Sequence, residues 1–130
     1  MFTKEWVTIM RQSKNICPRY QAAVEIIAQR WTALIIKVLM PGPRRFSELS
    51  DELEVVSDRV LSERLKELEQ TGIVTRRVIP EPPIRVEYTL TEKGLALAPI
   101  LTAIETWSHD WLTLADAPAE PVIDTANIPI

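Results

Sequence analysis

The fold is decided by residues 47–90, which read SELSDELEVVSDRVLSERLKELEQTGIVTRRVIPEPPIRVEYTL. A short segment at 47–53 with inward-facing leucines is followed by a three-residue link and a longer segment at 57–71, the spacing of a helix-turn-helix. Ser47 and Ser57 suit the N-caps of these helices, and a glycine directly after the second helix suits its end. The stretch therefore predicts two helices joined by a tight connection.

Two strand-like runs follow the longer helix directly. Residues 73–79 and 85–90 are rich in Val, Ile, Thr and Tyr, and a proline-rich link at 80–84 joins them. Because proline lacks a backbone donor, this link predicts a stiff hairpin tip. A helix pair followed by a hairpin indicates a winged helix-turn-helix, a mainly α fold with a small antiparallel β-hairpin (α+β).

Helical patterns continue on both sides of this unit. A helix is predicted from Arg19, and its apolar stripe comprises Tyr20, Ala23, Val24, Ile27 and Trp31. A second helix at 32–40 is apolar nearly all round, which indicates burial, and residues 44–46 suit a brief strand. Thr91 is expected to cap a long last helix, in which Pro99 kinks or delays the regular part.

The 130 residues suffice for one domain, and a 46% hydrophobic content allows a core without disulfide or metal support. We expect an N-terminal arm or helix at 1–16, a winged-helix domain with a C-terminal dimerisation helix at 17–113, and a flexible acidic tail at 114–130. The net charge of −3 argues against DNA binding at first, but residues 95–130 alone hold five acidic and no basic side chains. Residues 30–94 hold eleven of each, so a DNA-binding face depends on local clustering.

The helix at 57–71 divides into two faces at about 100° per residue. Its buried face consists of leucines, Leu61, Leu65 and Leu68, and its outer face carries polar side chains, Arg59, Ser62, Glu63 and Lys66. In the major groove Arg59 can hydrogen-bond to guanine in a bidentate way, and Glu63 can accept a hydrogen bond from cytosine. Ser62 can contact a base or a phosphate. Lys66 lies further along and suits a phosphate. An ordinary solvated charge face is the alternative.

The remaining candidate DNA contacts lie around this helix: the capping Ser57, Arg44 and Arg45 before the helix pair, and Arg76, Arg77 and Arg85 on the hairpin. A wing of this kind runs along the backbone or enters the minor groove, where arginine is favoured. Cross-strand pairing and solubility are the alternative roles of these arginines. Glu81 at the predicted tip would face phosphates and weakens the case.

An apolar stripe on the last helix predicts a homodimer interface, with Leu101, Ile104, Trp107 and Trp111 as its residues. Tryptophan is enriched at such interfaces, and a single helix after the wing has little of its own chain to pack on. Packing in the core of the same chain is the alternative.

Several classes of protein are excluded by composition. One cysteine and one histidine allow neither an intrachain disulfide nor a His/Cys zinc site within one chain, and this suits a reducing cytosol. The most apolar stretch, 31–40, is about half as long as a membrane span, and no signal peptide is recognised, so we expect a soluble cytoplasmic protein. With three glycines and no partner for His109, neither an enzyme nor a cofactor is predicted.

Several ordered motifs are shared with one family of regulators: Cys17-Pro18, 26–39 with Arg30-Trp31-Thr32, 42–49, 57–68, Pro83, 86–88 and 90–94. Over residues 17–112 the chain resembles HxlR-type winged helix-turn-helix regulators, relatives of the MarR group. The resemblance implies a homodimer that binds a palindromic operator in double-stranded DNA, as activator or repressor, and dimerises through its N- and C-terminal helices. Residues 54–56 depart from the Pro/Gly-containing turn that is frequent in the family, so the tightness of this turn is in doubt.

The resemblance also bears on Cys17, whose position serves some family members as a thiol sensor. A nearby helix N-terminus and Arg19 can favour the thiolate. A small buried hydrophobe at a helix start is the alternative. With no second cysteine, a sensing disulfide would need another subunit or a small thiol. The effector is not predicted.

A second function remains open beside transcription regulation. The acidic balance favours a winged-helix module for protein assembly without a specific DNA site, whereas the basic side chains on the recognition face and wing favour DNA.

Overall fold

A computed structural model describes residues 15–118 of the chain. Most of the predicted arm at 1–16 and most of the predicted tail at 114–130 lie outside this range. The elements follow in the order α2 (Pro18–Ala28), α3 (Thr32–Leu39), β1 (Arg44–Arg45), α4 (Phe46–Glu52), α5 (Asp58–Gln70), β2 (Val74–Ile79), β3 (Arg85–Leu90), α6 (Glu92–Leu95), α7 (Ala98–Trp111) and a 3-10 turn, η1 (Leu114–Asp116).

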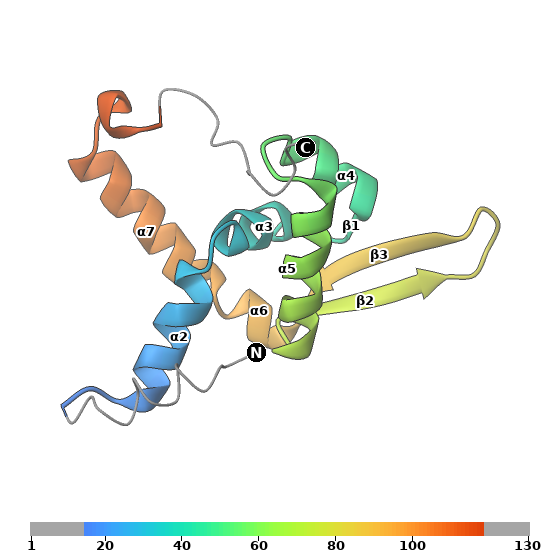
Figure 1. Ribbon diagram of the computed structural model, residues 1–130, viewed down its shortest axis with the longest axis horizontal. Coiled ribbons are helices and arrows are strands. Elements are labelled where there is room, and N and C mark those ends of the chain that lie inside the picture. The colour runs from blue at the N-terminus through green and yellow to red at the C-terminus, as the bar shows by residue number, and fades with distance from the viewer. Residues whose placement is uncertain (1–14, 119–130) are drawn as a thin grey trace, which may run out of the picture.

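The strands form a three-stranded antiparallel sheet in the order β1-β3-β2. The predicted hairpin is confirmed as β2 and β3, with Val74 opposite Leu90 and Ile79 opposite Arg85. The predicted brief strand is confirmed as β1, where Arg44 lies opposite Tyr88. Figure 1 shows the hairpin projecting beyond the helices, on the side away from α2 and α7.

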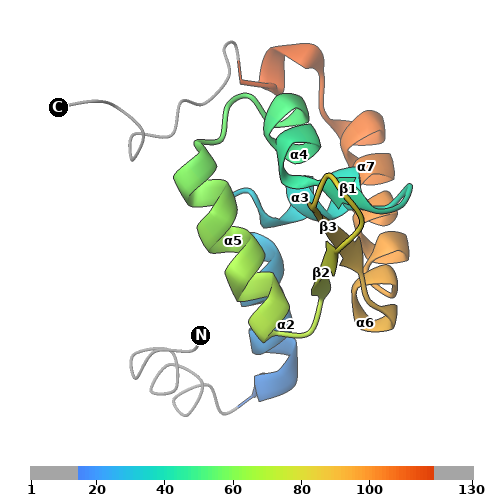
Figure 2. The same cartoon turned by 90° about the vertical axis from the view of Figure 1, so that its right-hand side faces the viewer.

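The core lies between α3, α4, α5 and the base of the sheet. Its fully buried side chains are large aliphatic ones, Ile35, Ile36, Leu39, Leu49, Leu61, Leu65 and Ile73. Helix α3 supplies three of these seven and lies between α5 and α7 (Figure 2). The prediction of a buried second helix is therefore confirmed, although Leu34 on its outer side is 46% exposed.

Cap chemistry sets the ends of the two helices that flank the wing. The Ser57 hydroxyl accepts a hydrogen bond from the Val60 N–H at 3.1 Å and starts α5, and the Thr91 hydroxyl accepts one from the Gly94 N–H at 3.1 Å and starts α6. Gly72 has a φ of +78° just after α5, where glycine is favoured. These three end signals are where the sequence predicted them.

The predicted N-cap of the short helix is wrong by two residues. Helix α4 begins at Phe46, so Ser47 lies inside its first turn and Arg45 is the N-cap. The backbone N–H of Arg45 donates to the Glu48 carboxylate at 3.0 Å. An acidic side chain three residues into the helix thus accepts from the N–H of the N-cap residue, as in a capping box.

The predicted stripe of the first helix is only partly correct. Helix α2 ends at Ala28, and Trp31 adopts a left-handed conformation with a φ of +75° between α2 and α3. Tyr20 is 65% exposed and Val24 is 45% exposed. The apolar spacing therefore indicated the helix correctly, but most of its stripe faces away from the core of its own chain.

Proline divides the predicted last helix, as expected. The chain forms a single turn, α6, and then α7, in whose first turn Pro99 lies, since a missing N–H costs nothing there. Gly94 in α6 is buried against the sheet, and a Cβ at this position would lie 2.3 Å from the Ile73 carbonyl oxygen. This close approach requires glycine and holds the start of α6 against the base of the wing.

Candidate nucleic-acid interface

The two faces of α5 are those that the sequence predicts. The leucine stripe is buried in the core, with exposed fractions of 0%, 1% and 3% for Leu61, Leu65 and Leu68. The polar set on the other side is exposed, namely Arg59, Ser62, Glu63 and Lys66. Helix α5 thus presents a continuous polar surface with two basic side chains to solvent.

Ser57 differs from the other candidates on this helix. It is 4% exposed, and its hydroxyl is engaged as the N-cap of α5. Asp58, the first residue of the helix, accepts a hydrogen bond from the Ser50 hydroxyl at 2.6 Å. The start of α5 is therefore fixed to its own cap and to α4, and the Ser57 side chain is not part of the exposed face.

The two arginines before the helix pair have different surroundings. The Arg44 Nη1 lies 2.9 Å from the Glu52 Oε1 at the end of α4, so this guanidinium is already paired. Arg45 points from the other face of β1 and is exposed. Only Arg45 presents an exposed cation at this edge of the sheet.

The wing arginines alternate between the two faces of the hairpin, as neighbours in a strand do. Arg76 lies opposite Tyr88, and both Arg77 and Arg45 lie opposite Glu87, one on each side of it. Arg76 and Arg77 are exposed. A row of two arginines with a central glutamate therefore crosses one face of the sheet.

Arg85 lies at the start of β3 and is half-buried. Its Nε is buried and has no hydrogen-bond partner within residues 15–118. The side chain lines an open hollow of about 300 Å³, together with neighbours from β1, α4 and the wing, Arg45, Phe46, Ser47, Pro83, Ile84 and Val86. Two of the candidate arginines, Arg45 and Arg85, thus line one hollow beside β1, toward the tip end of the hairpin strands.

The tip of the wing carries no basic side chain. Residues 80–84 read PEPPI, and Ile84 is 73% exposed. The exposed cations of the hairpin therefore lie along its strands, and the tip presents apolar groups and Glu81.

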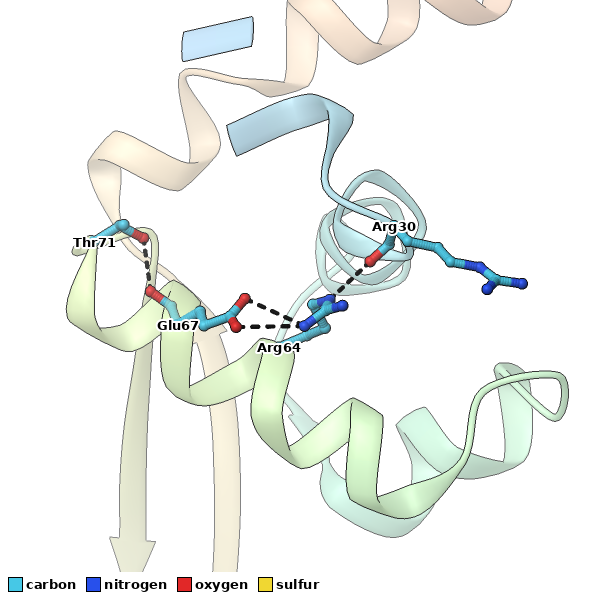
Figure 3. Close-up of polar contacts among 4 residues, drawn as sticks. All are labelled: Arg30, Arg64, Glu67 and Thr71. Carbon is cyan, nitrogen blue, oxygen red and sulfur yellow. Dashed lines mark hydrogen bonds and ion pairs between the residues drawn. The ribbon is translucent and has the colours of Figure 1, made fainter. Parts of the chain in front are cut away.

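Sequence reasoning missed one polar residue of α5, Arg64. This side chain leaves the helix between the leucine stripe and the polar face, where it is 18% exposed. Its Nε donates to the Arg30 carbonyl at 2.9 Å, and its Nη1 lies 3.3 Å from the Glu67 Oε1 (Figure 3). The i, i+3 pair with Glu67 was the only signal in the sequence.

The predicted dimer residues on α7 divide into two groups. Ile104, Trp107 and Trp111 are 51%, 56% and 72% exposed. Leu101, in contrast, is partly buried and packs against the core of its own chain, which is the alternative that the sequence left open for this stripe. A Lys37–Glu105 ion pair also joins α7 to α3. The first part of the stripe therefore faces the chain's own core, and only the later part is uncovered.

Cys17 precedes α2, and its thiol is exposed, so burial within its own chain is the wrong alternative. The backbone N–H groups of Tyr20 and then Arg19 lower the pKa of this thiol from its ordinary value, because they stabilise the thiolate. The Arg19 side chain adds a smaller lowering, against a raising contribution from desolvation. Cys17 thus combines exposure with a lowered pKa, the two conditions of thiol reactivity.

The part of the chain that the structure describes shows neither a membrane-spanning helix nor a metal-binding cluster. No helix there is long and apolar enough to cross a membrane. Across residues 15–118, no three His, Cys, Asp or Glu side chains gather as a metal site would require.

A helix pair with a buried leucine stripe, a polar outer face and an adjoining arginine-bearing hairpin defines a winged helix-turn-helix protein of the DNA-binding kind. The HxlR-like helix-turn-helix family matches residues 26–116. The chain belongs to this family, and the relatives YvaP and YodB are named as transcriptional regulators of the helix-turn-helix type.

The chain is 55% identical over 103 residues to the HTH-type transcriptional regulator YvaP of Bacillus subtilis, covering 79% of this chain and 94% of YvaP. It is 44% identical over 106 residues to YodB of the same organism, covering 82% and 95%. Reduced YodB superposes with a TM-score of 0.71 over 78% of this chain and 99% of YodB. Reduced HypR, a redox regulator, is 30% identical and superposes with a TM-score of 0.69 over 75% and 97%.

Proposed function

We propose that this regulator binds an inverted-repeat operator in double-stranded DNA as a homodimer, and that it does so in the cytoplasm. The observation that carries the proposal is α5, whose leucine stripe is buried while Arg59, Ser62, Glu63 and Lys66 face solvent beside the wing. A helix with these side chains suits the major groove, because arginine and glutamate can read guanine and cytosine edges there.

The candidate contacts separate into base-reading and backbone groups. Arg59 and Glu63 are assigned to bases, Ser62 to a base or phosphate, and Lys66 to phosphate. Ser57 acts indirectly by capping α5. Arg44 is already paired with Glu52, so its contribution to phosphate binding is smaller than that of Arg45.

The wing is assigned to the DNA backbone or the adjoining minor groove. Arg76, Arg77 and Arg85 lie along its strands, whereas the tip is apolar and carries Glu81. Contact through the strands keeps the glutamate away from phosphates. Arg45 and Arg85 line the same open hollow, where their guanidinium groups suit a phosphate oxygen.

Homodimerisation is supported by the surface of α2 and the end of α7. Tyr20, Val24, Ile104, Trp107 and Trp111 are all more than 40% exposed. Large apolar groups in this number are unusual on the surface of a monomer and are enriched at interfaces. Figure 1 shows α2 and α7 on the side of the molecule opposite the wing, so a second chain there leaves α5 and the hairpin accessible to DNA.

The test is selection of bound fragments from genomic DNA by the purified protein near physiological salt, read by sequencing. An enriched inverted repeat with half-sites about one helical turn apart, or a multiple of it, is expected. Dimerisation without enrichment would favour the protein-assembly alternative. The Ser62→Ala, Glu63→Ala double variant is the matched control, because it should select a changed sequence while it keeps its fold and its wing.

A second proposal concerns the signal to which the regulator responds. We infer that oxidants or electrophiles act on it through Cys17. The support is the exposed thiol with its lowered pKa, together with relatives solved in diamide-treated and quinone-bound forms of YodB and in an oxidised form of HypR. The Cys17 thiolate would add to a ring carbon of the quinone and form a thioether. The ring oxygens end up protonated, so the ring becomes a hydroquinone that stays attached to Cys17.

This second proposal is tested by the same DNA selection after treatment with diamide or a quinone. Loss or change of the enriched operator in the wild type, and an unchanged operator in Cys17→Ser, is expected. Equal responses of the two proteins would remove Cys17 as the sensor while leaving DNA binding intact. Because the chain has one cysteine, a disulfide formed with diamide must join two subunits or a small thiol.

A further inference from the structure

Arg64 joins the recognition helix α5 to the linker between α2 and α3. Its Nε donates to the Arg30 carbonyl at 2.9 Å across 34 residues of sequence. Glu67, one turn later, accepts from the Arg64 Nη1 at 3.3 Å and so orients the guanidinium (Figure 3). The Arg64 side chain is 18% exposed, so it is mostly withdrawn from solvent and from any DNA beyond the outer face.

The linker that Arg64 binds has a conformation that needs support. Trp31 has a φ of +75°, which is costly for a large L-residue and persists where neighbours impose it. The Arg30 guanidinium lies 4.7 Å from the centre of the Trp31 ring, and the Thr32 N–H donates to the Gln29 carbonyl at 3.1 Å. Arg64 supplies a hydrogen bond between this linker and the DNA-reading half of the molecule, beside the packing of Trp31 against the core.

The linker sets the direction of α2. No residue of α2 is buried, and this helix packs chiefly on α3. Its exposed Tyr20 and Val24 belong to the surface assigned to the second subunit. The orientation of α2 relative to α5 therefore decides how two recognition helices are placed in a dimer.

We propose that Arg64 is a positioning residue that fixes the spacing and angle between the two recognition helices, and thus the half-site spacing that the dimer accepts. The proposal rests on the operator-binding dimer proposed above. A hydrogen bond to a backbone carbonyl is well suited to this role, because it fixes the linker independently of which side chain occupies position 30. The planar guanidinium group of arginine can bond to the Arg30 carbonyl and to Glu67 at the same time, whereas lysine has a single ammonium group for both.

The experiment compares the wild type with Arg64→Lys, which keeps the charge, and with Glu67→Gln, which keeps the Arg64–Arg30 hydrogen bond. Each protein is titrated against the selected operator, the same operator with one base pair inserted between half-sites, and random DNA. One inserted base pair moves the half-sites apart by about 3.4 Å. Hydrogen exchange of the Thr32 amide reports on the linker in the same proteins.

In Arg64→Lys, the preference for the natural spacing over the inserted one should fall by about three- to tenfold, the effect of one hydrogen bond. The Thr32 amide should exchange faster, and the salt dependence of binding should be unchanged because the charge is retained. Glu67→Gln should keep most of the spacing preference. If Arg64 only stabilised the fold, Arg64→Lys would lower thermal stability without changing the ratio of the affinities for the natural and the inserted spacing.

An unchanged spacing preference in Arg64→Lys would overturn the role of Arg64 while leaving the proposed function in place. A third variant, Arg64→Met, removes the charge. A uniform loss of affinity of this variant for all three DNAs, with a smaller salt dependence, would also overturn the positioning role and would make Arg64 a phosphate contact. Failure of the wild type to select any inverted repeat would overturn the proposed function itself. If the Thr32 amide exchanged as slowly in Arg64→Lys as in the wild type, this would overturn the idea that Arg64 fixes the linker, without any measurement on DNA.

Discussion

The two ends of this molecule differ in how completely one chain covers its apolar groups. From α3 to β3 every element but β1 contributes to a closed core, and Leu61 and Leu49 have no exposed surface. In α2 and α7, by contrast, no residue is buried, although the two helices carry tyrosine, tryptophan, valine and isoleucine. The core end is covered by its own chain, whereas the open end, made of α2 and α7, leaves large apolar side chains exposed.

The difference indicates a division of labour between the ends. The closed core buries one face of α5 and the start of the hairpin, so it positions the polar groups of the recognition face. The open end lies opposite the wing in Figure 1 and is the surface that we propose for assembly with a second copy. Substitutions should therefore change either folding, assembly or DNA reading, according to the end in which they lie.

The largest effect is expected in the closed core. Leu61→Ala should lower the free energy of unfolding by about 2–5 kcal/mol, because it leaves a cavity among fully buried side chains. Urea denaturation measures the change, with Ser62→Ala on the exposed side of the same helix as control. Equal destabilisation by the two variants would contradict the division of α5 into two faces.

At the open end, Trp107→Ala should weaken dimerisation by at least about 2 kcal/mol, roughly thirtyfold in dissociation constant, as for a tryptophan at an interface centre. Sedimentation equilibrium measures this. Leu101→Ala is the comparison within the same stripe and should mainly lower the free energy of unfolding, since Leu101 packs on its own core. The reverse result would place the interface elsewhere.

The DNA-reading surface should show two kinds of effect. Arg59→Ala should weaken operator binding by about 1–3 kcal/mol and relax one base position. Arg77→Ala should weaken all sequences alike and reduce the salt slope by about 1, because it loses one phosphate contact. Fluorescence anisotropy at several salt concentrations separates them, and identical behaviour on operator and random DNA would contradict the assignment.

The smallest effect concerns the Cys17 thiol at the edge of the open end. Because backbone N–H groups lower its pKa, the thiolate is populated at lower pH than for an ordinary cysteine. The alkylation rate by iodoacetamide should therefore rise with pH earlier than the rate of a small cysteine peptide measured in parallel. A midpoint at or above that of the peptide would contradict the lowered pKa.

Local patterns in the sequence predicted the DNA-reading end well. The leucine spacing of α5, the Ser57 and Thr91 caps, the glycine at the helix end and the β-branched strands all depend on neighbours along the chain. The polar face of α5 follows directly from the same periodicity. These features need no knowledge of distant contacts.

The remaining features depend on which distant group covers a given side chain, and periodicity does not contain this information. Leu101 and Trp107 lie on one stripe, yet one packs on its own core and the other is exposed. The Arg64 hydrogen bond to the Arg30 carbonyl joins two segments that are distant in the sequence. The left-handed Trp31 lies in one of these two segments. Ser57 was predicted as both cap and DNA contact, and only its burial separates the two roles.

The division between the two ends is tested most directly by binding to a whole inverted repeat and to a single half-site. The wild type and a Trp107→Ala, Trp111→Ala double variant are compared on both DNAs. We predict that the wild type strongly prefers the whole repeat, and that the variant loses this preference but keeps the half-site affinity. A variant that still prefers the whole repeat, or that loses half-site affinity as well, would contradict the account.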